Sequence, residues 1–356
     1  MATPDANTSQ GLSCPSPQAG HASSRVMMGH GGGGLLSQQL IREVFGEAFG
    51  MQAGELAVDA AVVPTLRGPL AFTTDAFVVQ PLFFPGGSIG DLAVNGTVND
   101  LAVAGAEPRF LAASFVIEEG LPRADLARIA EAMGAAAREA GVRIVAGDTK
   151  VVERGHGDGV YITTSGIGEV LPGTRLSPAH VAPGDAVILS GTIADHGMAI
   201  MQMRQDLGFE ADIRSDTAPL HGLVRAMLTA CQDIRLMRDP TRGGLASCLA
   251  EMAESSRRGI AIESEAVPIA PAVAAACEML GLDPWLVANE GKLVAIVPAE
   301  AAQAVLAAMQ THPRGRDAVV IGRVVEDHPG RVAVRTAIGG RRIVPMPVGE
   351  LLPRIC

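Results

Sequence analysis

Strand-like and helix-like segments alternate along this chain, and that alternation restricts its possible folds more than any other feature. In the first half, extended apolar segments such as 58–63 and 70–79 are followed by helical patterns. The alternation resumes after a connection at residues 176–185 that contains Pro and Gly. Such alternation is typical of mixed α/β layers, and 356 residues are enough for two domains of ordinary size. We therefore predict a mixed α/β (α+β) chain with domains at residues 26–175 and 176–340.

The two ends of the chain differ from these domains in composition. Residues 1–25 have the composition of a disordered N-terminal extension. The chain ends at Cys356, and Gly349 and three prolines lie within the last residues, 341–356. Exposure concentrates at chain ends, so a thiol there is poorly placed for packing and well placed to move. We predict a flexible tail at 341–356 whose thiol could travel roughly 20–25 Å, at about 3.3 Å per residue.

Composition argues against several classes of protein. The net charge is −10, and no cluster of basic residues is interleaved with aromatic ones, so we expect no nucleic-acid partner. No apolar run approaches the roughly 20 residues of a membrane span, and the first residues do not resemble a secretory signal. Five cysteines without paired spacing argue against a disulfide framework. We therefore expect a soluble, cytoplasmic protein that does not bind membranes.

A glycine-rich segment, GHGGGG at residues 29–34, stands before a helical pattern. The backbone N–H groups of Gly31, Gly32, Gly33 and Gly34 could line an anion site without obstruction by side chains. The segment lacks both the GK[ST] ending of a P-loop and the strand-led G-x-G-x-x-G of a dinucleotide fold. Taken alone, the motif is therefore also compatible with a flexible linker.

Four aspartates are candidate metal ligands: Asp75 and Asp148 end strand patterns, Asp100 lies in VNDLA, and Asp239 begins DPTRGG. Magnesium prefers oxygen ligands and usually bridges one or two carboxylates to nucleotide phosphates. Any single aspartate before a helix or turn is more often a cap. Four of them among Gly, Thr and Lys favour a magnesium and nucleotide site.

Other charged residues extend this constellation. Lys150 in GDTK and Arg242 in DPTRGG could clamp phosphate oxygens, or simply form salt bridges with the aspartates. Glu290, in a turn before a buried-looking strand, could have its pKa raised by desolvation and act as a general base, although a plain turn glutamate is the competing interpretation. Asp195 and His196 could form a helix cap and first turn, or line the site.

Taken in order, these motifs resemble the HypE family of hydrogenase expression/formation proteins, in the superfamily of aminoimidazole ribonucleotide synthetase and selenophosphate synthetase. The resemblance covers about residues 26–356. Together with GHGGGG, it rests on the segments TTDAFVV, GDLAVNGTVNDLAVAGA, AGDTKVV, SGTIADHG, DPTRGGLA, ANEGKLV and the terminal PRIC.

The resemblance implies a two-domain aminoimidazole ribonucleotide synthetase-like fold and a homodimer whose N-terminal domains pair through their sheets. It implies that ATP and Mg²⁺ bind in a groove near that interface. Nucleotide binding would involve the four glycines, Asp75, Asn99, Thr149 and Arg242. The metal would be held by Asp75, Asp100, Asp148 and Asp239. Lys150 and Glu290 would lie close to the tail and act with Cys356 in catalysis.

The resemblance also implies an activity. A carbamoyltransferase would load a carbamoyl group onto the Cys356 sulfur, and this protein would use ATP to dehydrate the S-carboxamide to an S-cyanate. The nitrile would then pass to iron on a scaffold complex and become a cyanide ligand of a nickel–iron hydrogenase. Glu290 would remove nitrogen protons, and Lys150 would stabilise charge on the oxygen or phosphoryl group.

Two other functions compete with this one. An ATP-dependent small-molecule synthetase or kinase of the same superfamily would act on a free metabolite and would not need the tail. A non-enzymatic scaffold would use Cys356 as a metal ligand, but residues 340–355 contain no further cysteine or histidine.

Overall fold

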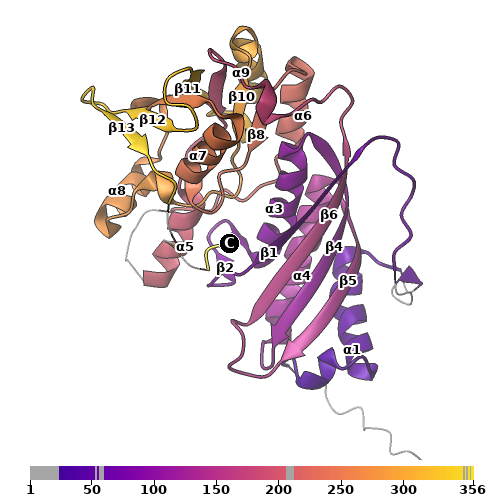
Figure 1. Cartoon of the computed structure of the whole chain (residues 1–356). Helices are drawn as coiled ribbons and strands as arrows, with labels where there is room; N and C mark the ends of the chain where they lie inside the picture. The colour runs from indigo at the N-terminus through magenta and orange to yellow at the C-terminus, as the bar shows by residue number, and fades with distance from the viewer. Residues whose placement is uncertain are drawn as a thin grey trace, which may run out of the picture.

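The chain forms two mixed α/β halves, each built on its own β-sheet (Figure 1). A computed structural model describes residues 24–52, 54–55, 60–205, 212–347, 349, 352 and 354–356. Most of the predicted disordered extension, with Cys14, therefore lies outside the described residues. Arg25, at the end of that extension, forms an isolated β-bridge with Pro122.

Four strands form the N-terminal sheet in the order β1-β6-β4-β5. The strand β1 pairs with β6 and β6 with β4 in antiparallel fashion, whereas β4 and β5 are parallel. A short hairpin, β2 and β3, follows β1 in the chain. The strands are β1 Leu70–Phe77, β2 Phe83–Phe84, β3 Gly87–Ser88, β4 Ala106–Glu118, β5 Arg143–Val152 and β6 Val160–Val170.

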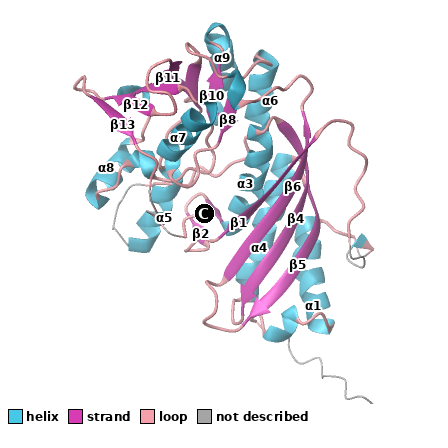
Figure 2. Ribbon diagram, in the orientation of Figure 1, coloured by secondary structure: helices cyan, strands magenta, loops and turns pink. Residues whose placement is uncertain are grey.

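Helices cover one face of this sheet and leave the other face open (Figure 2). Phe115 of β4 points to the helical side, where its ring lies 4.5 Å from that of Phe45. Leu70 and Phe72 of β1 are 58% and 70% exposed and lie on the open face. The helical segments of this half are α1 Leu35–Leu40, a π-helical turn Ile41–Gly46, α2 Glu47–Phe49, α3 Ile89–Val103 and α4 Arg123–Ala140.

The C-terminal sheet has seven strands in the order β13-β12-β9-β11-β7-β10-β8. Its interior strand β7 is buried on both faces, as its continuous apolar sequence AVIL predicts. Val187 and Leu189 pack into one core and Ala186 and Ile188 into another, because successive side chains point to opposite faces. The strands are β7 Ala186–Leu189, β8 Leu236–Arg238, β9 Gly259–Glu263, β10 Val294–Val297, β11 Val319–Val325, β12 Val332–Arg335 and β13 Arg341–Val344.

The helices of the C-terminal half form two layers around this sheet. Residues of α7 belong to the core on one face, whereas residues of α6 and α9 belong to the core on the other. These elements are α5 Asp195–Gln205, α6 His221–Ala230, α7 Gly244–Ser256, α8 Pro271–Leu280 and α9 Ala302–Thr311. None of the helices in the described part of the chain is long and apolar enough to cross a membrane.

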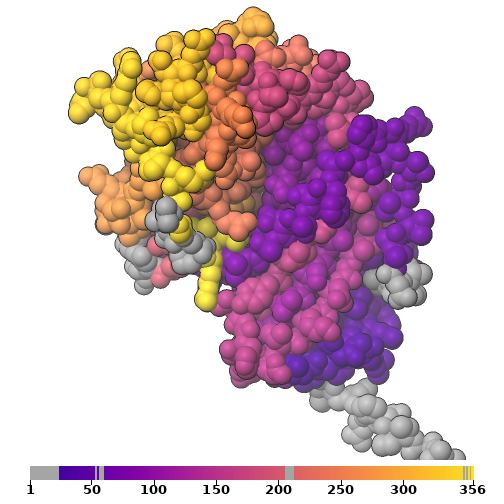
Figure 3. All heavy atoms as spheres, in the orientation of Figure 1, coloured from indigo at the N-terminus to yellow at the C-terminus, as the bar shows by residue number. Residues whose placement is uncertain are grey.

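The predicted mixed α/β architecture is confirmed, with differences at particular segments. The predicted strand at 58–63 does not form at residues 60–63, and 58–59 lie outside the described residues. Within the predicted tail, residues 348, 350, 351 and 353 are likewise outside the description. The described end, residues 354–356, lies against the N-terminal half near β2 (Figures 1 and 3).

Candidate functional site

The terminal thiol lies beside Glu290 in the interior of the molecule. Cys356 is partly buried and packs against the N-terminal core, and its thiol is in hydrogen-bonding range of the Glu290 carboxyl group. Glu290 is 4% exposed, and its Oε1 atom has no hydrogen-bond partner among the described residues. Burial, then the carboxylates of Asp216, Asp239 and Asp75, raise the pKa of Glu290 well above its usual value. Burial and the Glu290 charge likewise raise the pKa of the thiol well above its usual value.

The main chain at Glu290 is held from two sides. Asp216 accepts hydrogen bonds from the backbone N–H groups of Glu290, at 3.1 Å, and Gly291, at 3.2 Å. A Cβ atom at Gly291 would lie 1.8 Å from the Asp216 carbonyl oxygen, so this close approach requires glycine. Asn99 donates to the Glu290 carbonyl oxygen at 3.0 Å. The turn that carries Glu290 is therefore rigidly placed.

Asn99 was predicted to bind nucleotide, but the structure uses its side chain in another way. Its amide nitrogen donates to the carbonyl oxygens of Ala218 and Glu290, and its amide oxygen accepts from the backbone N–H of Leu220. The residue is 1% exposed on α3. In this structure Asn99 thus ties the two halves together and positions Glu290.

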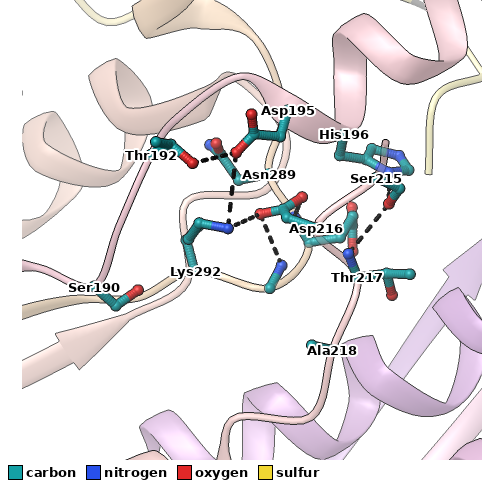
Figure 4. Close-up of polar contacts among 12 residues, drawn as sticks. Ser190, Thr192, Asp195, His196, Ser215, Asp216, Thr217, Ala218, Asn289 and Lys292 are labelled. Atoms are coloured by element: carbon teal, nitrogen blue, oxygen red, sulfur yellow. Dashed lines mark hydrogen bonds and ion pairs between the residues drawn. The ribbon is translucent and has the colours of Figure 1, made fainter. Parts of the chain in front are cut away.

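Figure 4 shows an ionic cluster of Lys292, Asp216 and Asp195, which contacts this turn through Asp216. The Lys292 ammonium lies 3.0 Å from Asp216 and 3.9 Å from Asp195. Asp195 also accepts a short hydrogen bond from Thr192. Although burial alone would raise it, Lys292, His196 and two hydrogen bonds hold the pKa of Asp216 below its usual value. The pKa values of Asp216 and Glu290, which lie next to each other, are therefore shifted in opposite directions.

Asp195 and His196 occupy the first turn of α5, as one of the two sequence interpretations had it. The other, that they line the site, stays a prediction. The His196 ring bonds Ser215 on one side and the Ile355 carbonyl oxygen on the other. Sequence reasoning missed Asp216, Ser215 and Lys292. The one sequence signal for Lys292 was its place in ANEGKLV, two residues after the predicted base; the segment around Asp216 carried no motif.

Three of the four predicted metal ligands, Asp75, Asp100 and Asp239, lie in the same region as Glu290 and the end of the chain. Asp75 ends up beside Arg242, with 3.7 Å between its Oδ1 and the guanidinium, and Asp100 accepts a 2.8 Å hydrogen bond from Thr73. Burial raises the pKa of both carboxyls. Burial, then the Asp100 charge, raises the pKa of Asp239 to about 7. These three carboxyl groups thus lie in a region where neighbouring positive charge only partly offsets their negative charge.

The strand register places the fourth predicted ligand elsewhere. Asp75 pairs with Thr164, Thr164 with Ala113, and Ala113 with Gly147, so these four positions point to the same face. Asp148 follows Gly147 and therefore points to the opposite, open face. Three strand spacings of about 4.8 Å also separate β5 from β1, roughly 14 Å in total. Accordingly, no group of three potential ligands converges on a metal position among the described residues.

Lys150 shares this separate location. Its register partner is Val116 of β4, so it projects from the open face with Asp148, and both residues are exposed. Within one chain Lys150 therefore does not lie beside Cys356. Thr149 faces the helical side instead, at a cavity of about 130 Å³ whose lining includes Phe45, Phe49 and Met51.

The glycine-rich segment packs against the same edge strand. A Cβ atom at Gly31 would lie 2.5 Å from the backbone nitrogen of Val151, the residue after Lys150. The Ser37 hydroxyl accepts from Gly33 N at 2.9 Å and donates to the His30 carbonyl oxygen at 2.7 Å. Residues 32–34 remain exposed. The glycine segment, Asp148 and Lys150 thus form one group, which we call the β5-edge group.

This chain is similar to known proteins over nearly its whole length. The family model for AIR synthase related proteins matches in two parts, its N-terminal domain at residues 57–170 and its C-terminal domain at 182–335. The carbamoyl dehydratase HypE of Azotobacter vinelandii is 55% identical over 331 residues, which cover 93% of this chain and 97% of the relative. This chain belongs to the HypE family. The Escherichia coli (strain K12) carbamoyl dehydratase HypE is 43% identical over 340 residues, which cover 94% of this chain and all of the relative.

Solved HypE structures have the same fold. The crystal structure of the hydrogenase maturation protein HypE in complex with ATP is 46% identical, with a TM-score of 0.89 over 93% of this chain and 99% of that one. A chain from a HypE–HypF complex is 48% identical, with a TM-score of 0.76 over 86% of this chain and 99% of that chain. Thiamine monophosphate kinase from Aquifex aeolicus, at 20% identity and a TM-score of 0.57 over 78% of this chain and 91% of that chain, shares the fold alone.

Proposed function

We propose that this HypE-family chain is an ATP-dependent carbamoyl dehydratase that converts an S-carboxamide on its own Cys356 into an S-cyanate, for cyanide ligation of iron in nickel–iron hydrogenase maturation. The observation that carries the proposal is the position of the terminal thiol, which lies against the Glu290 carboxyl group, whose Oε1 atom has no hydrogen-bond partner among the described residues. A site already filled by the end of the chain itself favours this function over a synthetase or kinase for free metabolites.

The reaction balances with ATP as the acceptor of oxygen. The carboxamide oxygen attacks the γ-phosphorus and ADP leaves, which turns a poor leaving group into a phosphate ester. The C–O bond then breaks, inorganic phosphate departs, and the two N–H protons are released as the C≡N bond forms. The sulfur–carbon bond stays intact throughout, so the product remains attached to Cys356.

Glu290 is the proposed base for the nitrogen protons. A carboxylate whose pKa has been raised is a stronger base once it ionises, and it lies where the substituent on the Cys356 sulfur would be. Carbamoylation of the sulfur removes the thiol proton that competes for the same carboxyl group. Arg242, at 3.7 Å from Asp75, supplies positive charge on this side of the site.

The proposal includes Mg²⁺ with the ATP. Burial raises the pKa values of Asp75, Asp100 and Asp239, and the charges of neighbouring carboxylates raise those of Asp100 and Asp239 further. Such a cluster of oxygen donors suits a divalent cation. Magnesium commonly takes only one or two carboxylates plus phosphate oxygens, so these residues fit it without a complete cage of side chains. When bound, the ion would neutralise charge on the phosphates. The nucleotide side of the site is assigned to the β5-edge group, Thr149 and Arg242.

We further propose that two copies form a homodimer through the open faces of their N-terminal sheets. Phe72, Ile167 and Phe110 are paired across β1, β6 and β4 and form an apolar row on that face. A symmetric interface would bury this row in both copies. A second copy would also supply Asp148 and Lys150 to a tail site that lacks them within one chain. Phe72→Glu should then give a monomer in sedimentation analysis, whereas a persistent dimer would contradict this interface.

The proposed partners follow from the two transfers that frame the reaction. A carbamoyltransferase must load Cys356, and the HypE–HypF complex among the similar structures supports such a contact. An iron-bearing scaffold complex must accept the cyanide. We place these steps in the cytoplasm, whose reducing conditions keep a terminal thiol free.

The decisive test is mass spectrometry of the C-terminal peptide. The protein is incubated with the carbamoyltransferase and carbamoyl phosphate, and ATP with magnesium is then added. A carbamoyl adduct should appear on Cys356 and then lose the mass of one water. Cys356→Ala should retain ATP binding without forming either product. An adduct that forms on Cys231, Cys248 or Cys277 instead would overturn the proposal.

A further inference from the structure

The residues just before Cys356 are held through their backbone atoms. The Arg354 carbonyl oxygen accepts hydrogen bonds from the backbone N–H of Gln80, at 3.2 Å, and from the Arg204 guanidinium. The Ile355 carbonyl oxygen accepts from His196 Nε2 at 2.7 Å, and Ile355 is only 3% exposed. Arg204 also donates to the Gln80 carbonyl oxygen at 2.6 Å, which joins the two anchoring segments.

The geometry around His196 defines its tautomer. A carbonyl oxygen can only accept, so the proton must be on Nε2, where it is donated to Ile355. Burial lowers the pKa of His196, which keeps the ring neutral and leaves Nδ1 as an acceptor. The Ser215 hydroxyl lies 2.8 Å from Nδ1 and donates to it. The ring edge also packs against Phe84, with centroids 5.5 Å apart.

The same short segment holds the catalytic carboxylate. Ser215 accepts from the backbone N–H of Thr217 at 3.1 Å, in addition to its bond with His196. Its neighbour Asp216 accepts from the backbone N–H groups of Glu290 and Gly291. Residues 215–217 therefore connect the groups that grip the tail to the turn that carries Glu290 (Figure 4).

We propose that His196 and Arg204 form a backbone latch that seats the tail, and that Ser215 couples the seated tail to the placement of Glu290. Neither latch residue bonds the thiol, so both are positioning residues. The latch binds main-chain carbonyl groups, so it grips the loaded and unloaded tail alike. The role of the latch in catalysis rests on the proposed dehydration, but its hydrogen bonds are present in the protein without a carbamoyl group.

The latch is tested by the rate at which N-ethylmaleimide alkylates Cys356 in the full-length protein, followed on the C-terminal peptide by mass spectrometry. Arg204→Met removes one charged donor near the surface, where the fold tolerates it, and should raise the alkylation rate about tenfold. His196→Ala should raise it similarly, and His196→Gln, which keeps an N–H donor, should restore part of the protection. Arg314→Met, which breaks an ion pair with Glu139, is the matched control and should leave the rate unchanged.

The outcomes separate the latch from the proposed chemistry, because alkylation needs neither ATP nor a carbamoyl donor. Equal rates in the native protein, Arg204→Met and His196→Ala would overturn the latch. A rise in Arg204→Met alone would overturn the role of His196, and so would a His196→Gln variant as exposed as His196→Ala. If the native protein fails to dehydrate its adduct while the latch variants still expose Cys356, the proposed function falls and the latch stands.

Discussion

The two faces of the N-terminal sheet carry different halves of the predicted site. The face covered by α3 and α4 presents Asp75 toward Asp100, Arg242 and the seated thiol. The open face presents Asp148 and Lys150. The glycine segment packs at the β5 edge against Val151, the buried neighbour of Lys150, whose side chain points to the covered face. One chain therefore brings the acidic groups and the thiol together, but leaves Asp148 and Lys150 turned away from them.

The two halves of the site differ in burial and in the charges around them. On the covered face, burial and neighbouring carboxylates raise the pKa values of Glu290 and Asp239, which suits proton transfer and metal binding. On the open face, Lys150 and Asp148 remain exposed to solvent. The following predictions test whether the halves work together across a dimer.

The largest expected effect is that of Glu290→Gln. The amide keeps the shape of the side chain but cannot accept a proton, so dehydration should fall by at least about 100-fold. Mass spectrometry should show the carbamoyl adduct on Cys356 persisting without loss of water. Glu278→Gln, an exposed glutamate on α8, is the control. Normal dehydration by Glu290→Gln would refute its role as the base.

The second prediction concerns mixed dimers. Lys150→Met and Glu290→Gln should each be inactive alone, because each removes one half of both sites. After the two variants are mixed and allowed to exchange subunits, half the dimers should contain one intact site, so about a quarter of native activity should return. Single-turnover product formation on Cys356 measures this recovery. Two separately inactive variants that stay inactive on mixing would place both residues in the same chain's site.

A third effect is the pH dependence of stability. The pKa of Asp239 rises from 3.8 to about 7, so between these values the folded state keeps a proton that the unfolded state releases. Stability therefore falls as pH rises through this interval, by at most about 4 kcal/mol at 1.36 kcal/mol per unit. Thermal unfolding should show native protein losing more stability from pH 5 to pH 8 than Asp239→Asn, while exposed Asp233→Asn behaves like the native protein. Equal pH dependence in all three would contradict the raised pKa.

The smallest effect should come from Thr73→Val. This change removes the 2.8 Å hydrogen bond to Asp100 and should cost about 1 kcal/mol in urea unfolding. Without that bond the pKa of Asp100 should rise further. More of the carboxyl group is then protonated at low pH, and metal binding there is weaker. Thr163→Val, at an exposed position on the other face, should change stability little. A loss in Thr163→Val equal to that in Thr73→Val would remove the distinction between the faces.

Much of the fold was readable from the sequence because its periodicities are local. The alternation of strand-like and helix-like segments predicted the mixed α/β layers to which β4 and α4 belong. The segment at 58–63 failed because an apolar run alone does not specify a pairing partner, and residues 60–63 pair with no strand.

The candidate site was predictable only in part, for a physical reason. Motifs named Glu290, Asp75 and Arg242, and the structure brings these to the tail. The sequence does not specify how β5 pairs with β4, however, and a shift of one residue along β5 decides which face of the sheet Asp148 occupies. The sequence also could not reveal the role of Asp216. That role depends on its close approach to Glu290 and Gly291, which are 74 and 75 positions further along the chain.

The sequence by itself determined the chemical inventory of this protein: a terminal thiol, a set of carboxylates, two cations and a glycine segment in the order typical of the HypE family. Residue types and local spacing specify these, because chemistry belongs to side chains and periodicity to neighbours. Only the tertiary structure decided which groups meet. Burial beside Glu290 made Cys356 a seated neutral thiol, and strand pairing placed Lys150 on the opposite face, because pKa values and faces depend on contacts between distant segments.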